Sequence, residues 1–282
     1  MPSINMRFPK GLKKAVTLSY DDGVASDVRL MEICKAHGLK ITFNINSGCF
    51  APEGSEYRED DIYCRMTKSD CVKLYKNSGM EVAVHGLTHS AFTNLAPAAR
   101  AREVSEDKVN LEKIFDQTMV GGAYPYGAYD EASLDILTQC GLGYYRTVTS
   151  THDFNIPRDF RVLDPTCHHA DPELDTLVDR FLNQTEIYDP LMFYLWGHSY
   201  EFRRDNNWEI IEKFAKKIGG HSDIWYATNA EIYNYVQLYK RLVWRSDLSK
   251  VFNPTYMPIF VQVEDNILEI KPGETVETKV TC

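Results

Sequence analysis

Short apolar segments alternate with longer amphipathic segments roughly seven times along this chain. The apolar segments, which we predict to be strands, cover residues 15–22, 40–46, 81–85, 144–148, 162–169, 191–199 and 224–228. The amphipathic segments, which we predict to be helices, cover residues 24–37, 69–77, 97–116, 131–140, 172–183, 207–218 and 229–243, with Ser69 and Asn229 as expected caps. Repeated strand-then-helix units form a parallel sheet, and this many units favour closure into an α/β barrel.

The end of the chain follows a different pattern. Residues 260–280 alternate apolar and polar side chains around Asp265-Asn266 and Pro272-Gly273, which predicts two or three antiparallel strands. We therefore expect a barrel over residues 1–243 and a short antiparallel β appendage over residues 244–282. The appendage is interpreted as a cap on the bottom of the barrel, with an oligomer contact or a small glycan-binding element as the alternatives.

Composition excludes several classes of function. The 282 residues are 44% hydrophobic and 25% charged, as in an ordinary globular protein. Lys and Arg total 31 against 40 Asp and Glu, so the net charge of −9 argues against binding to a phosphate backbone, and hence against nucleic acid as a partner. The longest apolar run, residues 191–196, is far too short for a membrane span.

The cysteines and the first residues bear on cellular location. The seven cysteines are odd in number and form no CxxC pair, which is typical of reduced thiols. No apolar signal segment is visible at the start of the sequence. We therefore expect a cytoplasmic protein, and a secreted form trimmed of its signal stays open as the alternative.

Polar side chains gather where the predicted strands end, which is where α/β barrels place their active sites. Each has an ordinary structural explanation, since acids cap helices and single histidines pack in cores. Two carboxylates and several imidazoles at one rim are nevertheless typical of a metal-dependent hydrolase. The residues concerned are Asp21, Asp22, His85, His89, Tyr126, Arg146, Cys167, His168, His169 and His198.

Four motifs occur along the chain in a recognisable order: SYDDG at 19–23, HGLTH at 85–89, YPYG at 124–127 and WGHS at 196–199. In these motifs the chain resembles the polysaccharide deacetylases (carbohydrate esterase family four, the NodB-homology family), over residues 10 to 240. The resemblance implies a distorted (β/α) barrel, usually of seven strands. It also implies a divalent metal, most often zinc with cobalt, nickel or manganese as alternatives, and removal of acetyl groups from N-acetylated or O-acetylated sugars.

The resemblance also implies a role for each motif residue. Asp21 corresponds to the catalytic base and His198 to the general acid. Tyr126 corresponds to the residue whose backbone N–H helps to hold the oxyanion. The metal ligands correspond to Asp22, His85 and His89. Three protein ligands leave coordination positions open for water and substrate, which suits a hydrolytic centre.

The chain departs from the family pattern at several positions. Ala123 stands where the family commonly has an arginine that orients the base, and Arg146 and Arg161 are the candidates to replace it. Trp196 stands where a small aliphatic residue usually lines the acetyl pocket. His168 and His169 have no family role, and we expect them to be structural or to lie behind the site. The predicted substrate contacts are Tyr124, Trp196, Arg146 and His168.

Three hypotheses remain at this point. The leading one is a metal-dependent hydrolase that removes acetyl groups from an N-acetylated or O-acetylated carbohydrate. The second is a cyclic ureide or imide hydrolase on the same barrel, and the third is a non-catalytic glycan-binding barrel. The acidic net charge favours a neutral glycan as partner. The polar segment at 47–68 is expected to form a wall of the substrate groove or a solvated insertion, and the oligomeric state is left open.

Overall fold

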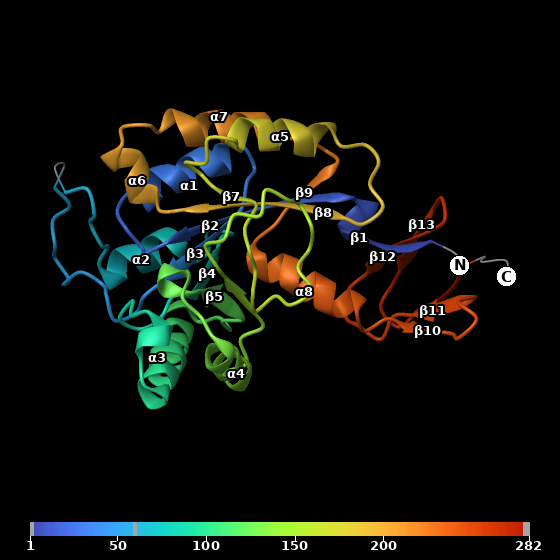
Figure 1. The fold of residues 1–282 in the computed structure, drawn as a ribbon, viewed down its shortest axis with the longest axis horizontal. Coiled ribbons are helices and arrows are strands. Elements are labelled where there is room, and N and C mark those ends of the chain that lie inside the picture. The colour runs from blue at the N-terminus through green and yellow to red at the C-terminus, as the bar shows by residue number, and fades with distance from the viewer. Residues whose placement is uncertain (1–2, 59–60, 279–282) are drawn as a thin grey trace.

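A curled parallel sheet forms the centre of the molecule, as the predicted fold class requires (Figure 1). The structure is a computed structural model that describes residues 3–58 and 61–278. The strands follow the order β6-β5-β4-β3-β2-β8-β7, and β9 pairs with β2 outside this path. Their bounds are β2 Lys14–Asp21, β3 Ile41–Ile45, β4 Glu81–Val84, β5 Gly121–Ala123, β6 Tyr144–Arg146, β7 Cys167–His168, β8 Leu191–Gly197 and β9 Ile224–Tyr226. The α/β fold with a curled parallel sheet is thereby confirmed.

Strand β2 is the central strand of this sheet. All eight of its residues are buried, and it pairs in parallel with three other strands. The pairing with β8 runs along most of its length, whereas β9 pairs only with Lys14–Val16 and β3 only with Leu18–Asp21. The carboxyl end of β2 therefore lies between β3 and β8 and carries Asp21 into the middle of the rim.

The predicted strand at 162–169 is mostly irregular. Leu163 bridges in parallel to Arg146 of β6, and its N–H donates to Tyr145 O at 3.0 Å. Farther along, the Thr166 N–H donates to Tyr194 O of β8 at 2.8 Å. The segment thus crosses from β6 to β8 and curls the sheet toward closure. Pro165 in its middle has no N–H to donate, which explains why only two residues form a regular strand.

Eight helices within the described residues cover the sheet, with α1, α5, α6 and α7 on one side and α3 and α4 on the other (Figure 1). Two expected caps are shifted, because the side chains of Thr67 and Thr228, rather than Ser69 and Asn229, accept the capping hydrogen bonds. None of these helices is long and apolar enough to cross a bilayer. The bounds are α1 Asp27–Ala36, α2 Lys68–Tyr75, α3 Pro97–Phe115, α4 Glu131–Gln139, α5 Leu174–Asn183, α6 Ser199–Arg204, α7 Glu209–Ile218 and α8 Asn229–Tyr239.

The C-terminal strands lie at the end of the molecule remote from α6, together with a strand that the sequence did not predict (Figure 1). Strand β1, Ile4–Arg7, pairs with β12 and not with the parallel sheet. One antiparallel sheet is β1-β12-β13 and the other is β10-β11-β14. The bounds are β10 Val243–Trp244, β11 Lys250–Phe252, β12 Ile259–Val263, β13 Asn266–Ile270 and β14 Thr275–Glu277. Val261 and Ile259 share a buried cluster with Ala15 and Met192, so this sheet packs against the amino-terminal ends of β2 and β8.

A buried carboxylate joins three helices beneath the rim. Asp27 begins α1 and is fully buried, and it accepts hydrogen bonds from Tyr75 of α2 at 2.6 Å and from Ser199 of α6. Burial raises the pKa of Asp27 to about 7, although the hydrogen bonds from Ser199 and Tyr75 oppose the shift. The helix that follows His198 is thus tied to α1 and α2 through this one side chain.

We predict that Asp27→Asn changes the pH dependence of stability. The folded pKa is raised above the unfolded value, so between pH 4 and about 7 the folded state binds more protons, and its stability falls as the pH rises. The asparagine variant has no carboxyl group to titrate at this position. Its free energy of unfolding should therefore rise relative to that of the unaltered protein as the pH increases across this range. Urea unfolding at pH 4.5 and pH 7 measures the difference. A constant difference between the two proteins would contradict the prediction.

Candidate metal centre and acid–base site

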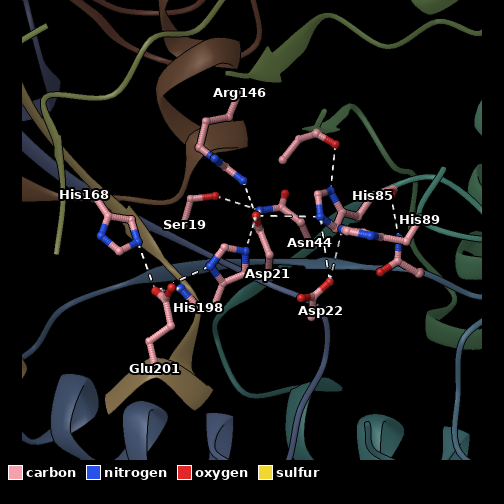
Figure 2. A network of polar contacts seen from close by, with 12 residues as sticks. Ser19, Asp21, Asp22, Asn44, His85, His89, Arg146, His168, His198 and Glu201 are labelled. Atoms are coloured by element: carbon pink, nitrogen blue, oxygen red, sulfur yellow. Dashed lines mark hydrogen bonds and ion pairs between the residues drawn. The ribbon is translucent and has the colours of Figure 1, made fainter. Parts of the chain in front are cut away.

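Side chains from the ends of four strands meet at the carboxyl end of the parallel sheet (Figure 2). Asp21 and Asp22 come from the end of β2, His85 and His89 follow β4, and Arg146 ends β6. His198 follows β8 and immediately precedes α6. The structure therefore brings together the residues that the motifs singled out, although they lie up to 177 positions apart in the chain.

The first cluster is formed by Asp22, His85 and His89, whose ligand atoms all lie within 4.8 Å of one another. Asp22 Oδ1 is 3.5 Å from His89 Nε2 and 3.9 Å from His85 Nε2. Two imidazole nitrogens and one carboxylate oxygen are a donor set that suits zinc, cobalt or nickel. The separations are those of groups that converge on a common point without being hydrogen-bonded to each other.

The protonation of His85 fits this cluster. Its Nδ1 lies 2.8 Å from Ala123 O, so Nδ1 carries the proton and donates to that carbonyl. Its Nε2 is then a bare lone pair, and it is buried with no hydrogen-bond partner among the described residues. Burial lowers the pKa of His85 to about 4, which keeps the ring neutral. An orphaned, deprotonated imidazole nitrogen that faces a carboxylate and a second histidine fits a cation ligand.

Asp21 is buried beside this cluster as an ionised group. Its Oδ1 accepts from Asn44 Nδ2 at 2.8 Å, and its Oδ2 accepts from Arg146 Nη2. The Nε2 atoms of His85 and His198 lie 3.7 and 3.8 Å from the same Oδ2. Burial by itself would raise the pKa of Asp21, but Arg146 and the two histidines hold it well below its usual range.

Of the two arginines considered as replacements for the one missing at Ala123, Arg146 is the one that reaches Asp21. Its side chain is fully buried, and its guanidinium also lies over the ring of Trp196, 4.4 Å from the centroid. Arg161 instead pairs with the carboxylate of Asp159, 2.7 Å away, in an exposed loop. Trp196 thus packs on the arginine that holds the carboxylate.

His198 connects Asp21 to a second carboxylate that the sequence did not single out. His198 Nδ1 lies 3.5 Å from Glu201 Oε2, on the side of the ring opposite Asp21. Although burial lowers the pKa of His198, the interaction with Glu201 and the charge of Asp21 raise it above the ordinary value. A histidine that stays protonated between two carboxylates can act as a proton donor at neutral pH.

Three histidines converge on Glu201. His168 Nε2 is 3.0 Å and His169 Nε2 is 3.3 Å from the Oε2 atom that also faces His198. Hydrogen bonds from His168 and His198 outweigh burial and lower the pKa of Glu201 well below its usual range. Glu201 is therefore an anion that faces three imidazole rings.

His168, His198 and Glu201 also have the spacing of possible metal ligands, but the protonation of His168 argues for a hydrogen-bonded network. The backbone N–H of Ala170 donates to His168 Nδ1 at 3.1 Å. That nitrogen must be unprotonated, so Nε2 carries the proton and donates to Glu201. A protonated nitrogen cannot bind a cation. His169 is stacked on Phe202 with ring centroids 4.0 Å apart, and its side chain is buried.

The remaining predicted site residues occupy different positions. Tyr126 is 68% exposed, and its ring lies 4.6 Å from that of His89 at the mouth of the site. Its left-handed backbone, with φ of 59°, belongs to the sharp turn at Pro125–Gly127. Tyr124 instead is buried, and its hydroxyl donates to Arg161 O at 2.8 Å. Its ring therefore packs in the core and presents no free face for a sugar.

Two functional residues escaped the sequence analysis for different reasons. Glu201 stands three positions after His198, and the His198 N–H lies 3.3 Å from its Oε2, as in a capping box. This spacing was a usable signal for a short helix. Arg65 donates to Asp22 Oδ1 at 2.9 Å from the segment at 47–68. No periodicity or motif in that segment marked it.

The comparisons with known proteins agree with the motifs. Residues 9–145 match the family model described as polysaccharide deacetylase, and this stretch contains Asp21, Asp22, His85 and His89. The predicted resemblance to the polysaccharide deacetylases is thereby confirmed for this stretch of the chain. No curated protein sequence matches the chain significantly.

Several solved structures are similar to this one. A Mycobacterium smegmatis protein assigned to the polysaccharide deacetylases has a TM-score of 0.57 at 16% identity, over 85% of this chain and 96% of that one. A family 4 carbohydrate esterase from Streptomyces lividans, in complex with acetate, has a TM-score of 0.49 at 17% identity, over 76% and 92%. The deacetylase PplD from Streptococcus pyogenes, in complex with acetate, has a TM-score of 0.41 at 20% identity, over 47% and 55%, so the match spans about half of that protein. At 16% identity, the likeness to the Mycobacterium smegmatis protein shows the fold alone.

We predict that the two clusters differ in cation binding. His85→Ala and His89→Ala should each weaken zinc binding at least about a hundredfold, because each removes one of three ligands. His168→Ala should leave zinc binding unchanged, since its Nε2 is a donor to Glu201. Equilibrium dialysis of the three variants and the unaltered protein measures this. Loss of binding in His168→Ala alone would place the cation in the other cluster.

Proposed function

We propose that this protein is a metal-dependent hydrolase that removes acetyl groups from an N-acetylated or O-acetylated carbohydrate. The proposal depends on the position of Asp21 between His198 and the cation cluster, which consists of Asp22, His85 and His89. The Oδ2 atom of Asp21 is 3.7 Å from His85 Nε2 and 3.8 Å from His198 Nε2. A base beside a cation cluster, with a proton donor on its other side, is what hydrolysis of an amide or ester requires.

The residues divide the reaction between them. Asp22, His85 and His89 would hold a divalent cation, which supplies a polarised acetyl carbonyl and a more acidic water when it is bound. Asp21 takes the proton of the attacking water. Asn44 and Arg146 orient the Asp21 carboxylate and keep it ionised, so that it can act as a base at neutral pH. We assign Arg146 this orienting role in place of direct contact with the substrate.

His198 and Tyr126 act on the other side of the scissile bond. An amine leaves only after protonation, and His198, with its raised pKa, donates that proton through Nε2. The carboxylate of Glu201 faces Nδ1 at 3.5 Å and orients the ring through its charge. The backbone N–H of Tyr126 would help to stabilise the negative charge that develops on the carbonyl oxygen.

The substrate class rests on the surroundings of this site. The exposed ring of Tyr126 offers a face for stacking beside His89, and Trp196 lines the site behind His198. The free face of Tyr126 suits a sugar ring. The family model and the acidic net charge both favour a neutral acetylated glycan over a charged polymer. A cyclic ureide stays an alternative substrate for the same catalytic groups.

We predict that Asp21→Asn keeps the cation and loses turnover. The amide cannot accept the proton of water, so the acetate release rate should fall by about 10²–10⁴ while zinc affinity changes little. Acetylated chitooligosaccharides, peptidoglycan and acetylated xylan, read by acetate release, and allantoin, read by ammonia release, form the substrate panel. Retained activity in Asp21→Asn would exclude it as the base. Release of ammonia from allantoin alone would favour the ureide alternative.

We predict that Glu201→Gln shifts the pH dependence of turnover. Glu201 raises the pKa of His198, so its removal should lower that pKa and move the alkaline limb of the kcat profile to lower pH. At pH 8 we expect kcat to fall by about 10–100-fold with little change in KM. Arg204→Gln serves as a control, because its contact with Glu201 is longer and exposed. An unshifted alkaline limb would contradict the assigned role.

A further inference from the structure

Residues 64–66 run beside the loop that carries Asp22. Ala25 N–H donates to Cys64 O at 2.8 Å, and Met66 N–H donates to Gly23 O at 2.9 Å. Val24 and Arg65 form the antiparallel bridge between these two hydrogen bonds. Residues 64–66 are therefore a short strap fixed by backbone pairing directly beside the cation cluster, and not a solvated insertion.

Arg65 points from this strap into the cluster. Its Nη2 donates to Asp22 Oδ1 at 2.9 Å, and its Nη1 donates to the backbone carbonyl of Asp22. Nη1 also donates to Asn46 Oδ1 at 2.7 Å. The side chain of Arg65 is only 15% exposed, so these contacts are made in a largely dry environment.

Asn46 carries the same network on to the second ligand. Its Nδ2 donates to the backbone carbonyls of His85, at 2.5 Å, and of Gly86, at 2.7 Å. Arg65 therefore contacts the first ligand directly and the backbone of the second through one buried amide. These contacts link the ends of β2, β3 and β4.

Asp22 needs such support because its backbone is in the left-handed region, with φ of 85°. A residue with a Cβ is strained in this region and stays there only when its surroundings hold it. The two hydrogen bonds from Arg65, one to the carbonyl and one to the carboxylate, fix both the backbone and the side chain of Asp22.

We propose that Arg65 is a positioning residue for the cation site, which holds Asp22 in a binding geometry before the cation arrives. The inference rests on the proposed metal-dependent function. It assigns to the strap at 64–66 a part in cation affinity that the family motifs do not contain. Groups that orient metal ligands in this way typically contribute 10–100-fold to affinity.

The positive charge of Arg65 works in the opposite direction, because it repels a dication. That charge is already paired with the Asp22 carboxylate at 2.9 Å. Apart from the bonds from Arg65, the one hydrogen bond described for the backbone of Asp22 is that from its own N–H to Asn44 O, at 2.9 Å. We therefore expect the loss of positioning to outweigh the relief of repulsion.

The test compares zinc affinity, measured by titration calorimetry, in the unaltered protein and in three variants. Arg65→Met keeps an unbranched apolar stem and removes the hydrogen bonds of the guanidinium, and it should weaken zinc binding by about 10–100-fold. Arg65→Lys retains one donor and should fall between the two. Arg29→Met is the matched control, since Arg29 pairs with Glu212 on the surface and its loss should leave the affinity unchanged.

A second readout separates positioning from a general loss of structure. Cobalt(II) in the site reports its ligand geometry in the visible spectrum, and Arg65→Met should alter that spectrum at saturating cobalt while circular dichroism stays the same. Unchanged or tighter zinc binding in Arg65→Met would overturn the inference and leave the proposed function intact. Failure of the unaltered protein to bind zinc or cobalt would overturn both.

Discussion

A buried negative charge at the end of β2 is the constraint on which the rest of the site depends. An ionised carboxylate in a protein interior is strongly unfavourable unless it is paired and hydrogen-bonded. Asp21 obtains that compensation from Asn44 of β3, Arg146 of β6 and the nearby imidazoles of His85 and His198. These partners come from four other segments, so the requirement to stabilise one charge brings the strand ends together at the rim.

The same principle operates at Glu201, with imidazoles in place of a guanidinium. Neutral histidines compensate a carboxylate by N–H donation without adding a full charge, so Glu201 keeps its negative charge for His198. Backbone groups fix the tautomers of the two histidines through their Nδ1 atoms. Ala170 N–H donates to Nδ1 of His168, and Ala123 O accepts from Nδ1 of His85. Opposite tautomers give the two histidines opposite roles, because His168 presents a proton at Nε2 and His85 presents a lone pair.

Local sequence pattern and family motifs predict much of the fold and of the candidate site. They miss features that depend on contacts between residues far apart in the chain. The strand and helix alternation predicted the parallel sheet, and the motifs predicted which acids and histidines meet. Strand β1 was missed because its partner, β12, lies more than 250 positions away, as the pairing of Ile4 with Val263 shows. Arg65 was missed because only the fold brings its segment to Asp22. Glu201 lies in a helix of six residues, too short to show a periodic pattern.

The position of Arg146 shows how an arginine can reach Asp21 from a strand other than the one that carries Ala123. Ala123, where the family commonly has an arginine, and Arg146 are register partners in the parallel strands β5 and β6. Residues paired in register on neighbouring strands project from the same face of the sheet. An arginine at either position can therefore extend toward the end of β2. Strand β6 lies one strand farther from β2 than β5 does, so an arginine on β6 needs the full length of its side chain to reach Asp21. The packing of Trp196 against the guanidinium, 4.4 Å from its ring centroid, supports that extended side chain. This explains in physical terms why Trp196 stands where the family usually has a small residue: the larger ring fills the space beside an arginine that reaches Asp21 from β6.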